Sequence, residues 1–108
     1  MSVVIDAVVE EPQPGLENPF VGWTHQCVEV VAVDAAGWLI EPQSPAAVAW
    51  CARGWLLRQG VPNATICRFS IWLTSQAGHT LELLNDCVRW TPDDFRRAWD
   101  EWVAAGQP

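Results

Sequence analysis

The clearest hydrophobic pattern in the chain is the run Ala-Val-Ala-Trp-Cys-Ala-Arg-Gly-Trp-Leu-Leu at residues 47–57. Apolar side chains recur there at the i, i+3, i+4, i+7 spacing that gives a helix one buried stripe, and a second apolar stripe lies beside the first. Ser44 and Pro45 suit the N-cap and the first helical position, and Gly60 suits the end of a helix. The pattern predicts a central helix between these signals, with Gly54 allowing another element to approach its backbone.

Two more helices are predicted towards the C-terminus. Residues 63–76 place apolar side chains at helical spacing, although the stretch is also rich in residues that favour strands. Residues 91–103 begin with Thr91 and Pro92, which suit an N-cap and a first helical position, and two aspartates follow in the first turn. The short stretch 79–86 between them fits either a strand or a helical turn.

The N-terminal part has a different pattern. Residues 26–33 and 37–40 are rich in strand-forming side chains, and the intervening Asp-Ala-Ala-Gly stretch supplies a glycine for a tight turn, so we predict a β-hairpin. Residues 1–18 combine a valine-rich start, which suits an edge strand, with the acidic residues, prolines and glycine of a linker. We expect an N-terminal arm over 1–18 and one globular domain over 19–108. The expected fold is α+β, with the hairpin packed against about three helices.

Composition and charge limit the classes of function. With 108 residues, half of them hydrophobic, the chain can bury a core without disulfides or metal ions. Its net charge is −7, from thirteen acidic and six basic side chains, and such a surface disfavours nucleic acid and favours a partner with a basic surface. No run of about 20 apolar residues is present, so we expect no membrane contact. The N-terminal pattern does not suggest secretion, and we expect a cytoplasmic location.

Several short motifs occur in an order that resembles a known family. They are Gly-Trp-Thr, the Asp-Ala-Ala-Gly turn, Ala-Val-Ala-Trp-Cys-Ala-Arg-Gly, Asn-Asp and the capped C-terminal helix. Over residues 20–104 the chain resembles domain of unknown function 6197, a family of small proteins from bacteria and their phages. Trp55 and Leu84 depart from the family pattern, which usually has alanine and tryptophan there. The resemblance implies a fold and a microbial or phage origin, and it carries no activity. The signature positions in this chain are Gly22, Trp23, Trp50, Cys51, Gly54, Asn85 and Asp86.

Cys51, His79 and Asn85 are the candidates for catalysis. They follow the Cys, His, Asn order of papain-like proteases, with Asp86 as an alternative partner for the histidine, which would suit a cysteine-dependent hydrolase or transferase. A catalytic cysteine usually lies at a helix N-terminus. The pattern instead places Cys51 well inside the predicted central helix, where it would act as a small apolar side chain. The cysteines form no close pair of the kind that zinc sites use, and we expect neither a metal nor another cofactor.

Three tryptophans lie outside the predicted helices, and exposed tryptophan is favoured in protein interfaces. The Asn-Asp pair is either a turn-stabilising pair or a polar site on a loop. We therefore expect binding to another protein rather than catalysis, with homodimerisation as a related possibility and a structural accessory subunit as a third. The more specific hypothesis is a phage or mobile-element regulator or inhibitor of a host or defence protein. The candidate binding residues are Trp23, Trp38, Trp90, Asn85 and Asp86.

Overall fold

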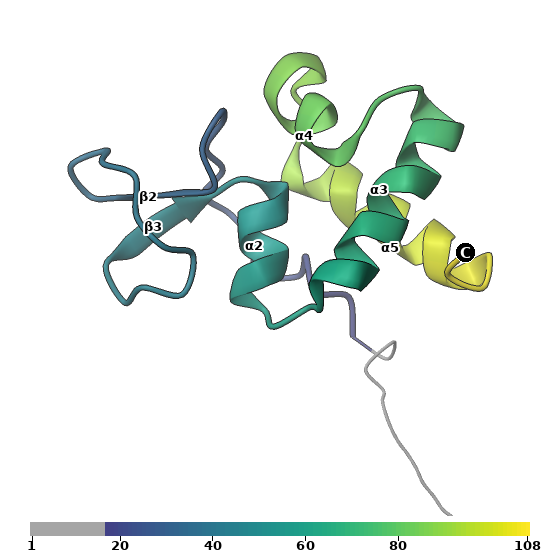
Figure 1. Cartoon of the computed structure of the whole chain (residues 1–108), viewed down its shortest axis with the longest axis horizontal. Helices are drawn as coiled ribbons and strands as arrows, with labels where there is room; N and C mark the ends of the chain where they lie inside the picture. Colours follow the sequence, from purple (N-terminus) through teal and green to yellow (C-terminus); the bar gives the residue numbers. More distant parts are fainter. Residues whose placement is uncertain (1–16) are drawn as a thin grey trace, which may run out of the picture.

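The computed structural model describes residues 17–108. The expected edge strand and nearly all of the predicted N-terminal arm lie outside the described residues. Within them the α+β class is confirmed, because a two-stranded antiparallel sheet lies beside a group of helices (Figure 1). The elements are β2 (Ala32–Asp34), β3 (Ala47–Trp50), α2 (Ala52–Arg58), α3 (Asn63–Ala77), α4 (Leu81–Leu83), the π-helical turn η2 (Leu84–Val88) and α5 (Pro92–Ala104).

The two strands belong to a small lobe that extends to one side of the helices (Figure 1). We call residues 28–50 the β-lobe. In the antiparallel pairing Ala32 lies opposite Trp50, and a bulge interrupts the register between Val33 and Asp34. The sheet is thus short, and its register is interrupted by a bulge.

The predicted hairpin of residues 26–33 with 37–40 is present only in part. Its turn forms as expected: the Gly37 N–H donates to the Asp34 carbonyl at 2.9 Å, and Gly37 has φ +87°. The pairing that follows the turn is a single bridge between Val33 and Leu39. The main partner of β2 is β3, which lies further along the chain, so the prediction of a simple hairpin is wrong in its second strand.

The predicted central helix is wrong in its first half. Residues 47–50 form β3, and α2 begins only at Ala52, with Cys51 as its N-cap in an extended conformation (φ −75°, ψ 175°). A run that is apolar at almost every position fits the strand period as well as the helix period, and here pairing with β2 decides the conformation. The end of the helix is as predicted, since Gly60 follows it with φ +82°.

Gly54 is where another element approaches α2, as the sequence predicts. A Cβ atom built on Gly54 would lie 1.9 Å from the carbonyl oxygen of Val31, much closer than any real contact of this kind. The backbone just before β2 therefore rests directly on α2. A larger side chain would push the β-lobe away from the helix.

The two predicted C-terminal helices are confirmed. α5 begins with a capping box, in which the Thr91 hydroxyl accepts from the Asp94 N–H at 3.3 Å and the Asp94 carboxylate accepts from the Thr91 N–H at 2.9 Å. α3 ends at Gly78, which has φ +79°. The stretch 79–86 takes the helical alternative and forms α4 and most of η2.

The hydrophobic core lies between α2, α3 and α5 and consists largely of aromatic rings. Phe20, from the segment before the β-lobe, is buried there, with its ring centroid 5.8 Å from those of Phe95 and Trp99. Asn18 fixes this segment, because its Nδ2 donates to the Arg96 carbonyl on α5 at 2.7 Å. Asn18, placed in the arm by the sequence, is thus attached to the helices. None of the helices in the part of the chain that the structure describes has the length and apolar character needed to cross a membrane.

Candidate functional site

Two of the three candidate tryptophans are packed into the protein. Trp23 is only 3% exposed, its ring stacks on Trp55 with a centroid distance of 6.5 Å, and its indole N–H donates to the Trp50 carbonyl at 3.1 Å. The expectation that Trp23 is a surface residue is therefore wrong. Trp90 is half-buried, with its ring 5.2 Å from that of Phe95. Both residues lie outside helices but pack against the core. Their burial could not be predicted merely from the fact that they lie outside helices.

Trp38 is different, because it is 73% exposed at the tip of the β-lobe. Asp34 fixes its backbone from two sides. The Asp34 carboxylate accepts from the N–H groups of Ala36 and Trp38 at 3.0 and 2.9 Å, and the Asp34 N–H donates to the Trp38 carbonyl at 3.0 Å. The turn thus presents an exposed indole on a backbone that is already ordered.

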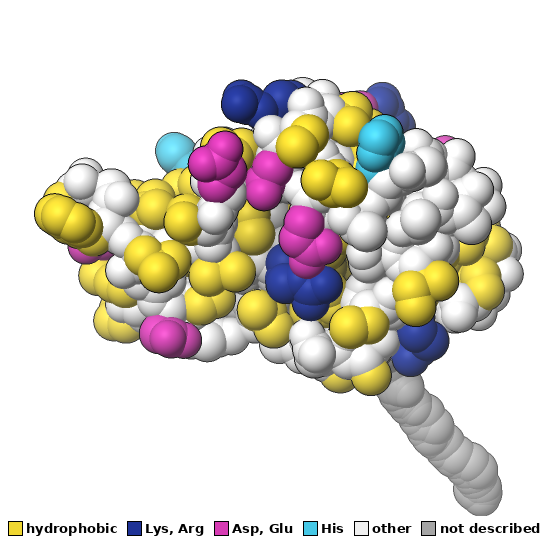
Figure 2. All heavy atoms as spheres, turned by 45° about the horizontal axis from the view of Figure 1, so that its top comes forward, with side chains coloured by type: hydrophobic (Ala, Val, Ile, Leu, Met, Phe, Trp, Pro, Cys, Tyr) yellow, Lys and Arg dark blue, Asp and Glu magenta, His cyan; other side chains and the backbone are white. Residues whose placement is uncertain are grey.

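Other apolar side chains are exposed on the same lobe. Leu39 is 67% exposed and Val48 is 45% exposed. Figure 2 shows hydrophobic side chains gathered at the left end of the molecule, over the end that the β-lobe forms. Contiguous exposed apolar surface on a small protein usually marks an interaction site. We call Trp38, Leu39 and Val48 the tip residues.

Charge is divided unevenly along the chain. Residues 1–52 contain seven acidic side chains and neither lysine nor arginine, whereas residues 53–108 contain six acidic side chains and six arginines. The whole net charge of −7 therefore belongs to the part of the chain that includes the β-lobe. Glu29, Asp34 and Glu41 are the charged residues within the lobe itself.

One arginine from outside reaches the base of the β-lobe. The guanidinium of Arg58, on α2, lies 5.1 Å from the centre of the Trp50 ring and donates to the carbonyls of Pro42 and Ser44 at 3.0 and 2.8 Å. These contacts hold the loop before β3 against α2. They also leave Arg58 engaged at the base and away from the tip residues.

Asn85 connects three separate parts of the chain. It is 1% exposed, and its Oδ1 accepts from Gln26 Nε2 at 2.8 Å and from the Ala52 N–H at 3.0 Å. Its Nδ2 donates to the Cys27 carbonyl at 3.0 Å and to the Asp86 carboxylate at 2.8 Å. All the hydrogen-bonding capacity of the amide is thereby used. Asn85 is a structural link between η2, the start of α2 and the entry to the β-lobe, and it is unavailable for a surface partner.

Asp86 extends this link to the lobe. Its carboxylate accepts from the Glu29 N–H at 2.9 Å, and Glu29 has φ +69°, which is unusual for a residue with a side chain. The π-helical turn η2 ends at Arg89 with φ +66°. Such conformations are unfavourable in isolation and persist where surrounding contacts fix them. The Asn-Asp pair therefore does more than stabilise its own turn.

A cavity of about 140 Å³ lies beside this pair, and Cys51, Asn85 and Asp86 all line it. His79 does not line it. Of the candidates for catalysis, the structure thus brings together three and leaves out the imidazole. Burial raises the pKa of the Cys51 thiol and so disfavours its thiolate, and the sulfur accepts a hydrogen bond from the Gly54 N–H at 3.3 Å. A protonated thiol without a base is poorly suited to nucleophilic attack.

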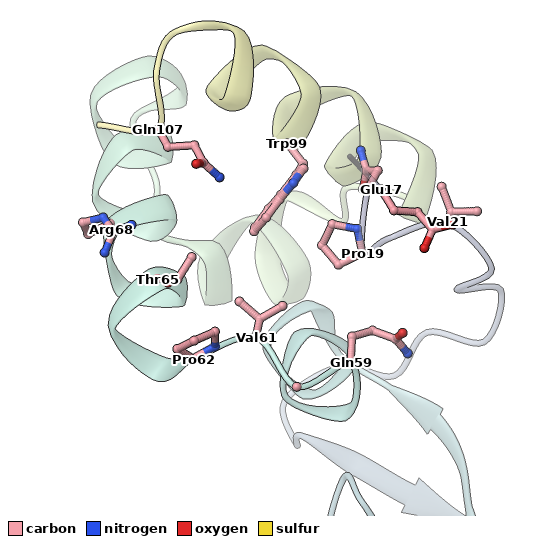
Figure 3. Close-up of a pocket in the computed structure, with 12 residues that line it drawn as sticks. Glu17, Pro19, Val21, Gln59, Val61, Pro62, Thr65, Arg68, Trp99 and Gln107 are labelled. Atoms are coloured by element: carbon pink, nitrogen blue, oxygen red, sulfur yellow. The ribbon is translucent and has the colours of Figure 1, made fainter. Parts of the chain in front are cut away.

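A larger cavity of about 660 Å³ lies where the N-terminal segment, the α2–α3 connection, α3 and α5 meet. Figure 3 shows the Trp99 ring and the Val61 side chain pointing toward one another across it, with Pro19 on one side and Thr65 and Arg68 on the other. The volume is in the range of small-molecule sites. Sequence reasoning missed this cavity because its walls come from four segments and no single motif marks it.

No group of three or more histidine, cysteine, aspartate or glutamate side chains in residues 17–108 is arranged to hold a metal ion. No family model, curated protein or solved structure matches the chain. The resemblance to domain of unknown function 6197 therefore stays a prediction.

Proposed function

We propose that the protein binds another protein through the tip of the β-lobe, with Trp38 as the main contact. The observation that carries this proposal is the 73% exposure of an indole whose backbone Asp34 already holds in place. Tryptophan is among the residues that contribute most to binding when an interface covers them. A preformed turn also loses little conformational entropy on binding.

The proposed partner has a basic surface around an apolar depression. The depression would accept the indole of Trp38, while basic groups would lie near Asp34 and Glu41 of the β-lobe. The absence of lysine and arginine from residues 1–52 favours such a partner over an acidic one. The biological role that we propose is regulation or inhibition of a host or defence protein by a phage or mobile element. Small size, acidity and the family resemblance support this setting.

Site-specific photocrosslinking tests the proposal. A photoreactive amino acid is placed at position 38, and in a matched control at Ile71, which is 70% exposed on α3. The proposal predicts that position 38 crosslinks one basic protein from a host lysate and that position 71 does not. Binding of that protein, once purified, is then measured for Trp38→Ala and Ile71→Ala.

Trp38→Ala is expected to weaken the complex by about 30-fold or more, and Ile71→Ala by less than about threefold. Equal losses for the two variants would contradict the assignment of Trp38. If position 38 crosslinks only to a second copy of this chain, and the protein forms a dimer on size-exclusion chromatography, the partner is a second copy of this chain and the proposal of a basic partner is wrong. A strictly monomeric protein with no crosslink at position 38 would refute the proposal.

A further inference from the structure

Cys27 and Cys51 lie at the two ends of the β-lobe and next to each other. Gln26 pairs with Trp50 in a parallel bridge, and the Cys27 N–H donates to the Trp50 carbonyl at 3.2 Å. Because the two segments run in the same direction at this single bridge, the next residue on each, Cys27 on one and Cys51 on the other, lies close to the other. Neighbouring strands are about 4.8 Å apart. That spacing falls within the Cα separations of about 4.4–6.8 Å seen in disulfides.

The side chains converge on the same stretch of backbone. The Cys27 thiol donates to the Val30 carbonyl at 3.4 Å, and the Cys51 N–H donates to the Val31 carbonyl at 3.1 Å. Burial, together with the neighbouring Cys51, raises the pKa of the Cys27 thiol to about 11. Both cysteines are free thiols in this structure.

We propose that Cys27 and Cys51 form a redox modification site, which a hydroperoxide converts into a disulfide that closes the base of the β-lobe. Cys27 reacts first, because it is half-buried while Cys51 is only 8% exposed. Because the pKa of Cys27 is about 11, its thiolate is scarce at neutral pH, so this first step is slow there and becomes faster as the pH rises. The thiol loses its proton to water or hydroxide and the sulfur attacks the O–O bond, which forms an S–O bond and releases an alcohol or water. The Cys51 sulfur then attacks the Cys27 sulfur, the S–S bond forms, the S–O bond breaks and water leaves with the Cys51 proton. The two thiols lose two electrons and the peroxide gains them.

The bond would change the lobe rather than the helical core. It would enclose all of the β-lobe, and with it Trp38, in one covalent loop whose ends cannot separate. The Cys51 sulfur would give up its hydrogen bond from Gly54 at the start of α2. The inference concerns the thiols alone and holds whether or not the tip residues bind a protein.

The test uses a full-length background in which exposed Cys67 and Cys87 are replaced by serine. The protein is treated with hydrogen peroxide, cut after glutamate without reduction, and mapped by mass spectrometry. Cleavage after Glu29 and Glu41 separates the two cysteines, so a disulfide appears as a linked pair of peptides lacking two hydrogens. Hydrogen exchange of residues 28–50 is followed in parallel and is expected to slow by about tenfold in the oxidised protein.

Cys27→Ser and Cys51→Ser in the same background serve as controls, with folding checked by circular dichroism. Each should abolish the linked peptides, and serine at position 51 can still cap α2. Oxygen adducts on Cys27 without a link, disulfides only between molecules, or no oxidation at either cysteine would each overturn the proposal. A linked pair without a change in hydrogen exchange would overturn the closure of the lobe.

Discussion

At the scale of single residues, Asn85 and Trp38 show two opposite uses of a polar or aromatic side chain. Asn85 is buried, and its amide makes all of its hydrogen bonds within the protein. Trp38 has its backbone fixed by hydrogen bonds, while its ring is exposed to solvent. A buried amide of this kind is costly to lose because its partners stay buried without it. The exposed indole has no such role in the fold.

Replacing Asn85 by alanine should therefore lower the free energy of unfolding by about 2–4 kcal/mol, because the Ala52 N–H and the Cys27 carbonyl lose their partner. Denaturant unfolding followed by tryptophan fluorescence measures the change. Exposed Asn63, which makes a hydrogen bond of 3.2 Å with Arg53, provides the matched control, with an expected change within about 0.5 kcal/mol. Equal stability of the two alanine variants would show that the Asn85 network contributes little.

The structural role of some of these residues can be predicted from the sequence, and that of others cannot. Gly54 stands out because glycine is unfavourable inside a helix unless something requires it, and the contact with Val31 supplies that requirement. The Asn-Asp motif marks Asn85 in the sequence, but the role of Asn85 depends on partners from residues 26 to 52 that only the fold brings near. The burial of Trp23 could not be predicted from its position outside the helices, because a loop tryptophan can insert into a core as readily as a helical one.

At the scale of elements, the division of residues 47–57 into β3 and α2 decides how the β-lobe attaches to the helices. The strand and helix meet at Cys51, and the segment before β2 lies on Gly54. Local sequence could not reveal this division, because nearly every residue of the run is apolar. By contrast α3 and α5 have glycine or capping signals at their ends, and those signals do not depend on distant partners.

Gly54→Ala tests this attachment. Alanine favours helices, so on propensity alone the change would stabilise α2 by up to about 1 kcal/mol. The clash with the Val31 carbonyl should instead destabilise the protein by about 3 kcal/mol. Thermal and denaturant unfolding measure the difference.

Gly106→Ala is the matched control for this change. Gly106 has φ +92° and open space around its Cα, so the expected loss is about 1 kcal/mol from backbone strain alone. If Gly54→Ala were no more destabilising than this control, the close approach of the β2 segment to α2 would be wrong.

At the scale of the whole molecule, the net charge is concentrated in the N-terminal half of the chain. The acidic excess lies in residues 1–52, which include the β-lobe, and the arginines begin at Arg53, in the first turn of α2. Residues 53–108 have six acidic and six basic side chains and so no net charge, whereas the β-lobe has three acidic side chains and no basic one. Long-range attraction to a basic partner would therefore orient the protein with the β-lobe forward.

Association with the proposed basic partner should accordingly slow as salt increases. Raising the salt concentration from about 50 mM to about 500 mM is expected to lower the association rate constant by about tenfold, while the dissociation rate constant changes little. Glu41→Gln on the β-lobe should reduce this dependence, and Glu101→Gln on α5 should not. Stopped-flow or surface-based kinetics measure both rates. A salt-independent association rate, or equal effects of the two variants, would contradict steering by the lobe.

The bridge between Gln26 and Trp50 means that the chain leaves the helical body and returns to it at almost the same point. The segment between Asp34 and Ala47 is therefore a loop whose two ends lie together, with Arg58 holding the part before β3, and changing the length of the turn that carries Trp38 adds little closure entropy. Such a loop can be exchanged for another without rebuilding the aromatic core. The protein is in this sense a scaffold on which new recognition sequences can be installed, by selection in nature or by grafting in the laboratory.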